Sequence, residues 1–254
     1  MHTELENSGK CGDFYPVENY LLGQDPFDPI ELAHRVVVRV PRSRLPSSSL
    51  VDFLDDDSAV LDCGRSTREQ YSVLAKRART IDNLDAFSYD NYPSILFDLS
   101  SKSLPEELKE RFDVIYCFSI LEHVPDPFTA ARNLTRMLRT NGQIIGYVPW
   151  LFPYHAGRGV GQQGFEDFWR FSPEGLGLLF AEGGSIEVFP TRGRAASALL
   201  ILMFWRGRNL WKGLERKLPG WKNATRLIAS KGSNRWQASG YEFVFRAGAG
   251  NALT

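Results

Sequence analysis

Residues 112–127 read FDVIYCFSILEHVPDP, and this stretch decides the fold of the chain. Its first half, Phe112–Phe118, is an almost unbroken apolar run, which is typical of a buried strand. Small and polar residues follow, and Asp126 and Pro127 are suited to cap and open a helix. A strand that leads into a helix in this way places residues 117–123 at its carboxyl end, where open α/β sheets bind their ligands.

Strands and helices alternate from Ser58 onward. The sequence predicts buried strands at 59–63, 78–81, 94–97, 113–119 and 143–148, with helices at 67–77, 105–111 and from Pro127 to about Asn141-Gly142. Two late strands, 185–189 and 241–245, lack a helix of ordinary length between them and are expected to pair antiparallel. The alternation predicts an α/β fold with a mostly parallel sheet and helices on both faces.

Composition restricts the class of protein. The chain has 254 residues, 43% of them apolar, and a formal net charge of zero, so nothing global indicates a nucleic-acid partner. Three widely spaced cysteines, Cys11, Cys63 and Cys117, argue against a disulfide framework or a zinc site, and no metal site is expected. The N-terminus has no secretory pattern, and no apolar run is long enough to span a membrane. We therefore expect a cytoplasmic protein.

The chain divides into two parts by pattern. Residues 1–50 contain five prolines and a serine run, and they are expected to form an N-terminal arm of unclear structure. Within it, residues 36–40 fit either a short edge strand or a segment laid across the domain. Residues 51–254 form the main domain, with an insertion at about 191–236.

The ends of the first three predicted strands carry the residue types that a nucleoside cofactor requires. Asp62 and Gly64 lie at the end of the first strand, where glycine permits close backbone approach. Asp82 is predicted to end the second strand and accept hydrogen bonds from ribose hydroxyls, with Asp85 as its less favoured substitute. Asp98 ends the third strand, near the expected position of an adenine amino group.

The first loop departs from a glycine-rich pattern. Residues 62–68 read DCGRSTR, so that Ser66 and Arg68 stand where further glycines are usual. The same loss removes the dinucleotide fingerprint, which makes a nicotinamide dehydrogenase a poor fit. An ordinary strand-to-helix turn without a cofactor remains the alternative for this loop.

Four later segments carry a family resemblance: ILEHVPDP at 120–127, VP at 148–149, FPYH at 152–155 and DFWRFSPEGL at 167–176. Their order resembles the type 11 group of class I S-adenosylmethionine (SAM)-dependent methyltransferases, in a bacterial branch linked to glycan or lipid-linked metabolism. The resemblance covers about residues 58–190. It implies a Rossmann-like, seven-stranded, mostly parallel sheet with a reversed final strand, and SAM as the cofactor.

Carried over by position, the resemblance also implies site residues. The cofactor would be held by Asp62, Gly64, Asp82 and Asp98, with Phe118 and Ser119 beside its methionyl part. The acceptor would be met by Glu122, Tyr154, Trp169 and Arg170. His123 or His155 would act as the catalytic base if the acceptor must lose a proton. For His123 the alternative is ordering of its loop, and for Trp169 and Arg170 it is packing and anchoring.

The insertion at 191–236 is strongly cationic. Eleven arginines and lysines stand there against one acid, Glu215, and an apolar run at 199–205 precedes leucines and Trp211 at helical spacing. Such a cationic amphipathic helix fits docking of residues 195–235 to a membrane surface. A helical lid over the sheet or a protein-binding surface fits the same pattern, and nucleic acid is not expected.

Two functions follow from these patterns. The first is a SAM-dependent methyltransferase acting on a glycan, lipid-linked or small-molecule acceptor, located in the cytoplasm or peripherally at the inner membrane face. The rival is a non-catalytic methyltransferase-like scaffold, or a membrane-surface binding protein, that has lost SAM. Ser66 and Arg68 favour the rival, whereas the acids at the strand ends favour the enzyme.

Overall fold

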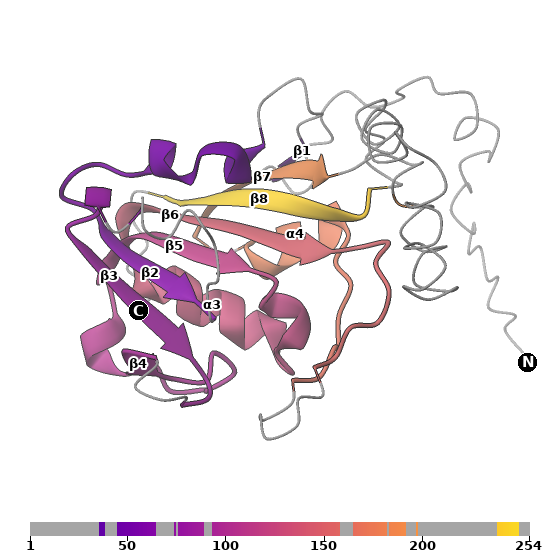
Figure 1. Cartoon of the computed structure of the whole chain (residues 1–254), viewed down its shortest axis with the longest axis horizontal. Coiled ribbons are helices and arrows are strands. Elements are labelled where there is room, and N and C mark those ends of the chain that lie inside the picture. Colours follow the sequence, from indigo (N-terminus) through magenta and orange to yellow (C-terminus); the bar gives the residue numbers. More distant parts are fainter. Residues whose placement is uncertain are drawn as a thin grey trace, which may run out of the picture.

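The computed structural model describes residues 36–38, 45–64, 74, 76–88, 93–157, 165–181, 183–191, 197 and 238–248. Its centre is an eight-stranded sheet of order β1-β7-β8-β6-β5-β2-β3-β4 (Figure 1). The strands are β1 Val36–Val38, β2 Ala59–Cys63, β3 Thr80–Asp85, β4 Ile95–Leu96, β5 Phe112–Phe118, β6 Leu138–Pro149, β7 Gly184–Thr191 and β8 Gly240–Ala247.

Seven of these strands confirm the predicted sheet and its reversed final strand. β2 pairs in parallel with β3 and β5, and β5 pairs in parallel with β6. β8 runs antiparallel to both of its neighbours, β6 and β7. The eighth strand, β1, adds in parallel to the outer edge of β7, so this part of the N-terminal arm extends the sheet.

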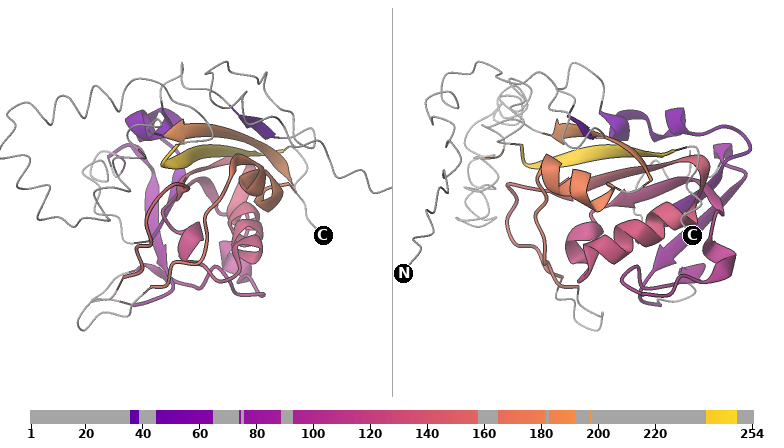
Figure 2. Two further views of the ribbon diagram at one scale, coloured as in Figure 1. Left: turned by 90° about the vertical axis from the view of Figure 1, so that its right-hand side faces the viewer. Right: turned by 180° about the vertical axis from the view of Figure 1, so that it is seen from behind.

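Helices cover both faces of the sheet. α3 (Pro127–Met137) and α4 (Pro173–Leu179) lie on one face, where Ala130, Leu134 and Leu176 are fully buried (Figures 1 and 2). The 3-10 helix η1 (Pro46–Phe53) covers the other face, together with the buried Leu74. Close packing of apolar side chains on both faces gives the sheet its rigidity.

Hydrogen bonds fasten η1 to the sheet. The hydroxyl of Tyr116 in β5 donates to the Leu50 carbonyl at 2.8 Å, and the Ser47 amide and hydroxyl donate to the buried Glu242 carboxylate in β8. η1 is therefore part of the main domain. The predicted domain boundary at residue 50 divides this helix and is wrong.

The start of α3 confirms its prediction, but its end does not. The Asp126 carboxylate accepts from the Thr129 amide at 3.0 Å, and Pro127 occupies the first turn. The helix ends at Met137 rather than near Asn141, because Leu138 already pairs with Phe112 as the first residue of β6. Backbone pairing with β5 thus takes these residues from the helix, although their own pattern allowed it to continue.

Two predicted features lie outside the described residues. These are Ser66 and Arg68 in the first loop, and the cationic insertion apart from Thr191 and Ser197. Within the part of the chain that the structure describes, no helix is long and apolar enough to cross a membrane. The predicted membrane-surface role of residues 195–235 stays a prediction.

Candidate functional site

Gly64 closes β2 with a backbone conformation that favours glycine. Its φ is +77°, and its amide donates to the Leu84 carbonyl at 2.8 Å. A Cβ atom at this position would lie 2.4 Å from Cδ1 of Ile120. No side chain fits there without displacing Ile120, so the packing of Ile120 and the positive φ both require glycine at this turn.

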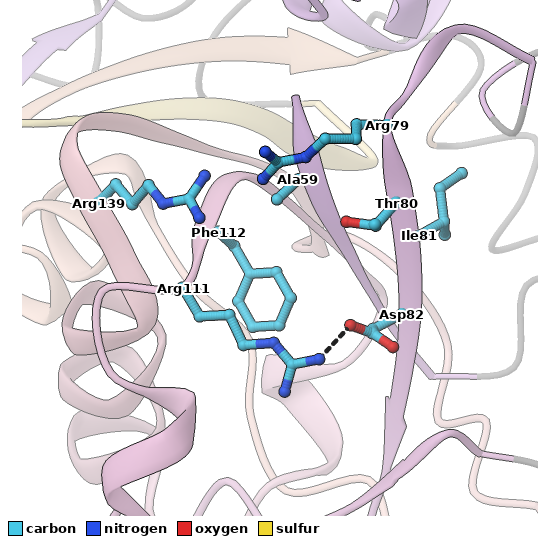
Figure 3. A pocket seen from close by; sticks show the side chains of 8 residues that line it. All are labelled: Ala59, Arg79, Thr80, Ile81, Asp82, Arg111, Phe112 and Arg139. Carbon is cyan, nitrogen blue, oxygen red and sulfur yellow. Dashed lines mark hydrogen bonds and ion pairs between the residues drawn. The ribbon is translucent and has the colours of Figure 1, made fainter. Parts of the chain in front are cut away.

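The prediction that Asp82 ends the second strand is wrong. β3 continues to Asp85, and Asp82 lies within it opposite Leu61. Its carboxylate accepts from Nη2 of Arg111 at 2.6 Å and lines a pocket of about 560 Å³ together with Arg79 and Arg139 (Figure 3). This pocket adjoins the amino ends of the strands, which is the opposite edge from the predicted cofactor site.

Asp85 occupies the strand end that was assigned to Asp82. It is the last residue of β3, and one of its oxygens accepts from the Phe87 amide at 3.1 Å. Burial raises the pKa of Asp85 above its ordinary value, and backbone hydrogen bonds from Phe87 and Ala86 act against that rise. A half-buried carboxylate at this position is suited to accept from ribose hydroxyls.

Two further acids stand near the same edge. Asp62 lies within β2 rather than after it, and it is 1% exposed. Asp98 follows β4 by two residues, is exposed, and accepts from the Ser100 amide at 2.8 Å. Because the carboxyl ends of parallel strands share one edge, Asp62, Asp85 and Asp98 stand at the edge where such sheets bind nucleotides.

The chain turns sharply after β5. Phe118 ends the strand, and the next residue, Ser119, has a φ of +56°, which is uncommon for a residue other than glycine. The Ser119 amide donates to the Tyr147 carbonyl at 2.9 Å, and its side chain is exposed. This strained turn directs the chain from the sheet edge into the 3-10 helix η3, Leu121–His123.

Glu122 and two histidines form a cluster just beyond this turn. Neither carboxylate oxygen of Glu122 has a hydrogen-bond partner, although the side chain is 0% exposed. Oε1 of Glu122 lies 3.8 Å from Nε2 of His123 and 3.7 Å from Nε2 of His155. The two imidazole rings meet edge to face, with 4.9 Å between centroids. We call Glu122, His123 and His155 the Glu-His cluster.

The chain between β6 and α4 brings His155 to this cluster. Residues 150–157 leave the sheet edge and residues 165–171 return beside them (Figure 2), joined by an antiparallel bridge between Gly157 and Phe165. The Glu122 carbonyl accepts from the amides of Phe168 and Trp169 at 2.8 and 3.2 Å. These contacts fix the returning segment against η3.

Asp167 orients His155. One oxygen of its carboxylate accepts from the His155 amide at 2.8 Å and lies 3.1 Å from Nδ1 of that ring. Hydrogen bonds from Arg170, its strongest interaction, hold the pKa of Asp167 at about 2. The pKa of His155 is raised above its ordinary value, mainly by its interaction with Glu122, and burial opposes this rise.

Arg170 anchors the segment instead of facing a substrate. Its guanidinium donates to both oxygens of Asp167 and to the carbonyls of Phe152, Pro153 and Trp169. All five N–H donors of an arginine are thereby engaged, and none is left for an acceptor molecule. The predicted substrate-binding role of Arg170 is therefore corrected to a positioning role.

The other predicted acceptor residues differ in accessibility. Tyr154 is 65% exposed and Trp169 is 40% exposed, while the indole N–H of Trp169 donates to the Val124 carbonyl at 2.9 Å. Glu122, expected to meet the acceptor, has no exposed surface. Both aromatic residues retain accessible surface, whereas Glu122 reaches a ligand only through the cluster.

The sequence patterns missed the roles of Asp167 and Glu166. Asp167 stands in the quoted DFWRF segment without a function assigned to it, and the Glu166 carbonyl contacts Nδ1 of His123 at 2.5 Å. Spacing also gave no sign of the cluster, because Glu122 and His155 lie far apart in the chain. An acid three residues before an arginine, a spacing that allows an ion pair, was the available signal for Asp167.

Replacing Asp167 by asparagine is expected to lower the free energy of unfolding by about 3 kcal/mol, because the change leaves Arg170 partly buried and unpaired. Arg170→Lys should cost less, since lysine keeps the charge but loses the bidentate geometry. Denaturant unfolding measures both effects. Glu106→Gln is the matched control, because it breaks an exposed pair with Lys109, and a similar loss in that variant would contradict the prediction.

The sheet order and the sites at its edge define the class of this protein as a class I SAM-dependent methyltransferase, as the resemblance implied. The chain belongs to the methyltransferase domain family, whose sequence model matches residues 39–175.

Relatives with known names match shorter parts of the chain. The ubiquinone biosynthesis O-methyltransferase of Pseudomonas entomophila (strain L48) is 32% identical over 97 residues, which cover 34% of this chain and 42% of that protein. The enzyme of the same name from Pseudomonas putida (strain GB-1) is 44% identical over 111 residues, covering 37% and 48%. The chain thus spans less than half the length of these relatives.

Among solved structures, the [4+2]-cyclase SpnF is similar with a TM-score of 0.48 and 15% identity, covering 80% of each chain. The 1,6-didemethyltoxoflavin-N1-methyltransferase of Burkholderia thailandensis, solved with S-adenosylhomocysteine, has a TM-score of 0.44 and 16% identity, covering 80% of this chain and 76% of its own.

Proposed function

We propose that this chain transfers the methyl group of SAM to a hydroxyl group of a small-molecule acceptor. The observation that carries the proposal is the Glu-His cluster beyond the carboxyl end of β5. Methyl transfer depends mainly on alignment of donor and acceptor, and it needs help with a proton only when the acceptor must lose one. An amine with a free lone pair needs no such group, so a buried cluster of this kind favours an oxygen acceptor.

The described residues at the sheet edge fit the cofactor. Gly64 turns the chain at the end of β2, and Asp85 takes the ribose hydroxyls in place of the predicted Asp82. Asp98 is exposed for the adenine amino group, and Phe118 and Ser119 lie where the methionyl part would pass. Bound SAM supplies an electrophilic methyl group on a sulfonium.

The Glu-His cluster acts on the acceptor as one unit. Both Nε2 atoms face the Glu122 carboxylate, so neither His123 nor His155 stands free as an isolated base. The cluster takes up the hydroxyl proton as the oxygen forms its bond to the methyl carbon and the carbon–sulfur bond breaks. The exposed surfaces of Tyr154 and Trp169 line the acceptor side.

The names of the relatives support an oxygen acceptor, because both matched Pseudomonas proteins are called O-methyltransferases. Glycan and lipid-linked acceptors are larger members of the same hydroxyl class. The rival function is a scaffold without catalysis, and the altered loop at Ser66 and Arg68 is the feature that favours it.

A methyl-transfer assay with isotopically labelled SAM tests the proposal. Phenols and sugar alcohols would be compared with amines of matched shape, and transfer to the hydroxyl compounds is expected. Transfer to amines alone would contradict the oxygen acceptor. Binding of S-adenosylhomocysteine with no transfer to any acceptor in a broad panel would support the scaffold instead.

A further inference from the structure

The two histidines of the Glu-His cluster present the same ring nitrogen to the carboxylate. Nδ1 of His123 contacts the Glu166 carbonyl, which can only accept, so this nitrogen carries the proton. Nδ1 of His155 lies 3.1 Å from the Asp167 carboxylate and 3.3 Å from the Pro153 carbonyl, which are also acceptors. In the neutral tautomer that these contacts select, both Nε2 atoms direct a lone pair toward Glu122.

The centre of the cluster therefore holds acceptors without a donor. Glu122 is 0% exposed and neither of its oxygens has a hydrogen-bond partner. A buried carboxylate facing two imidazole lone pairs is costly unless a positive charge lies between them. A proton or a metal ion can supply that charge, and the ring contacts leave both Nε2 atoms available to bind either one.

These ring contacts are the arrangement that metal-binding histidines adopt. A ligating histidine usually donates its other ring N–H to a carboxylate or a backbone carbonyl, which fixes the ring and its tautomer. His155 does so to Asp167, and His123 does so to Glu166. Arg170 in turn holds Asp167 in place through two hydrogen bonds.

We propose that Glu122, His123 and His155 bind a divalent transition-metal cation of the Zn²⁺ type. One ligand atom from each residue lies within 4.8 Å of the others. Two imidazoles and one carboxylate form a known set for catalytic zinc, with bonds of about 2.0–2.2 Å and ligand atoms about 3.3 Å apart. The observed 3.7 and 3.8 Å from the two Nε2 atoms to Oε1 exceed that spacing by about half an ångström.

This proposal corrects the sequence-based expectation that no metal site exists, and it deepens the proposed function, on which its catalytic part rests. Three protein ligands leave a position open for the acceptor oxygen. A cation held there would lower the pKa of a hydroxyl in that position, so that its proton would pass to water and not to the histidines. The cation thus explains how a cluster without a free base can activate a hydroxyl.

Calorimetric titration of the full chain with Zn²⁺ alone, after dialysis against a chelator and then buffer, tests the site. We expect one equivalent to bind the native chain, and Glu122→Gln, His123→Ala and His155→Ala each to weaken binding at least about 100-fold. Glu106→Gln, at an exposed position, should bind as the native chain does. Equal affinity in all variants, or no binding at all, would overturn the proposal.

Two further measurements keep the result unambiguous. Visible absorption of Co²⁺ should show a bound species with the native chain and lose it in His155→Ala, a partly exposed position at which folding is expected to survive. Absence of that difference would also overturn the site. Titration of the same preparations with S-adenosylhomocysteine reports separately on the proposed function, since cofactor binding does not depend on the metal.

Discussion

Glu122→Gln is expected to lower the rate of methyl transfer by at least about 100-fold, while S-adenosylhomocysteine affinity stays within about threefold. Glutamine keeps the shape of the side chain but removes the charge toward which both histidines point. The positive charge between the two histidines, a metal ion or a proton, then loses the carboxylate that is its main partner. The acceptor hydroxyl then keeps its proton, and transfer slows.

The measurement is single-turnover transfer of labelled methyl with saturating SAM, which isolates the chemical step from binding. Glu106→Gln serves as the matched control, because its carboxylate lies on the surface in the 3-10 helix η2, Glu106–Leu108. Thermal unfolding of each variant shows whether the buried substitution has disturbed the fold. A folded Glu122→Gln protein with a native rate would remove the cluster from the mechanism.

Asp85→Asn is expected to weaken S-adenosylhomocysteine binding at least about 10-fold, which corresponds to losing a hydrogen bond to a charged group. Asp85 ends β3 at the edge where its neighbour β2, and β5 beyond β2, also end. An amide accepts more weakly than a carboxylate and presents a donor to the ribose hydroxyls. Calorimetric titration measures the change.

Asp82→Asn is the contrasting variant. This substitution removes an ion pair with Arg111 near the amino ends of the strands, at the edge opposite the expected cofactor site. The affinity of the variant for S-adenosylhomocysteine should therefore stay within about threefold of native. The two variants together distinguish Asp85, the ribose-binding residue that the structure indicates, from Asp82, the one that the sequence predicted. Greater loss in Asp82→Asn than in Asp85→Asn would refute the ribose assignment.

The sequence predicted the sheet well where apolar runs are continuous. β2 is buried along its length and β5 is buried at five of its seven residues, and a run of apolar residues identifies such strands directly. The start of α3 was equally clear, because a capping aspartate followed by proline is a local signal. These features depend on residues close together in the chain.

The errors have a common physical origin. The apolar run of β3 stops at Ile81, but pairing with β2 carries the strand on to Leu84, and pairing with β4 includes Asp85. Pairing with β5 likewise ends α3 at Met137. In both cases a neighbouring strand overrides the preference of polar residues, and this neighbour cannot be seen in a local pattern.

The sequence predicted the individual residues of the site, but not that they lie close together in the fold. His123, His155 and Glu122 were each identified, yet their convergence depends on the chain from 150 to 171 leaving the sheet edge and returning. Asp167 was missed because its role is to orient His155 and bind Arg170. Such positioning contacts follow from the folded geometry and not from sequence spacing.

Calorimetric titration of the native chain with S-adenosylhomocysteine tests the central claim most directly, namely that the carboxyl edge of this sheet binds a SAM-type cofactor. We expect one site with micromolar affinity despite the serine and arginine in the first loop. No detectable heat at millimolar ligand, with a folded protein, would contradict the account and leave the scaffold as the function of this chain.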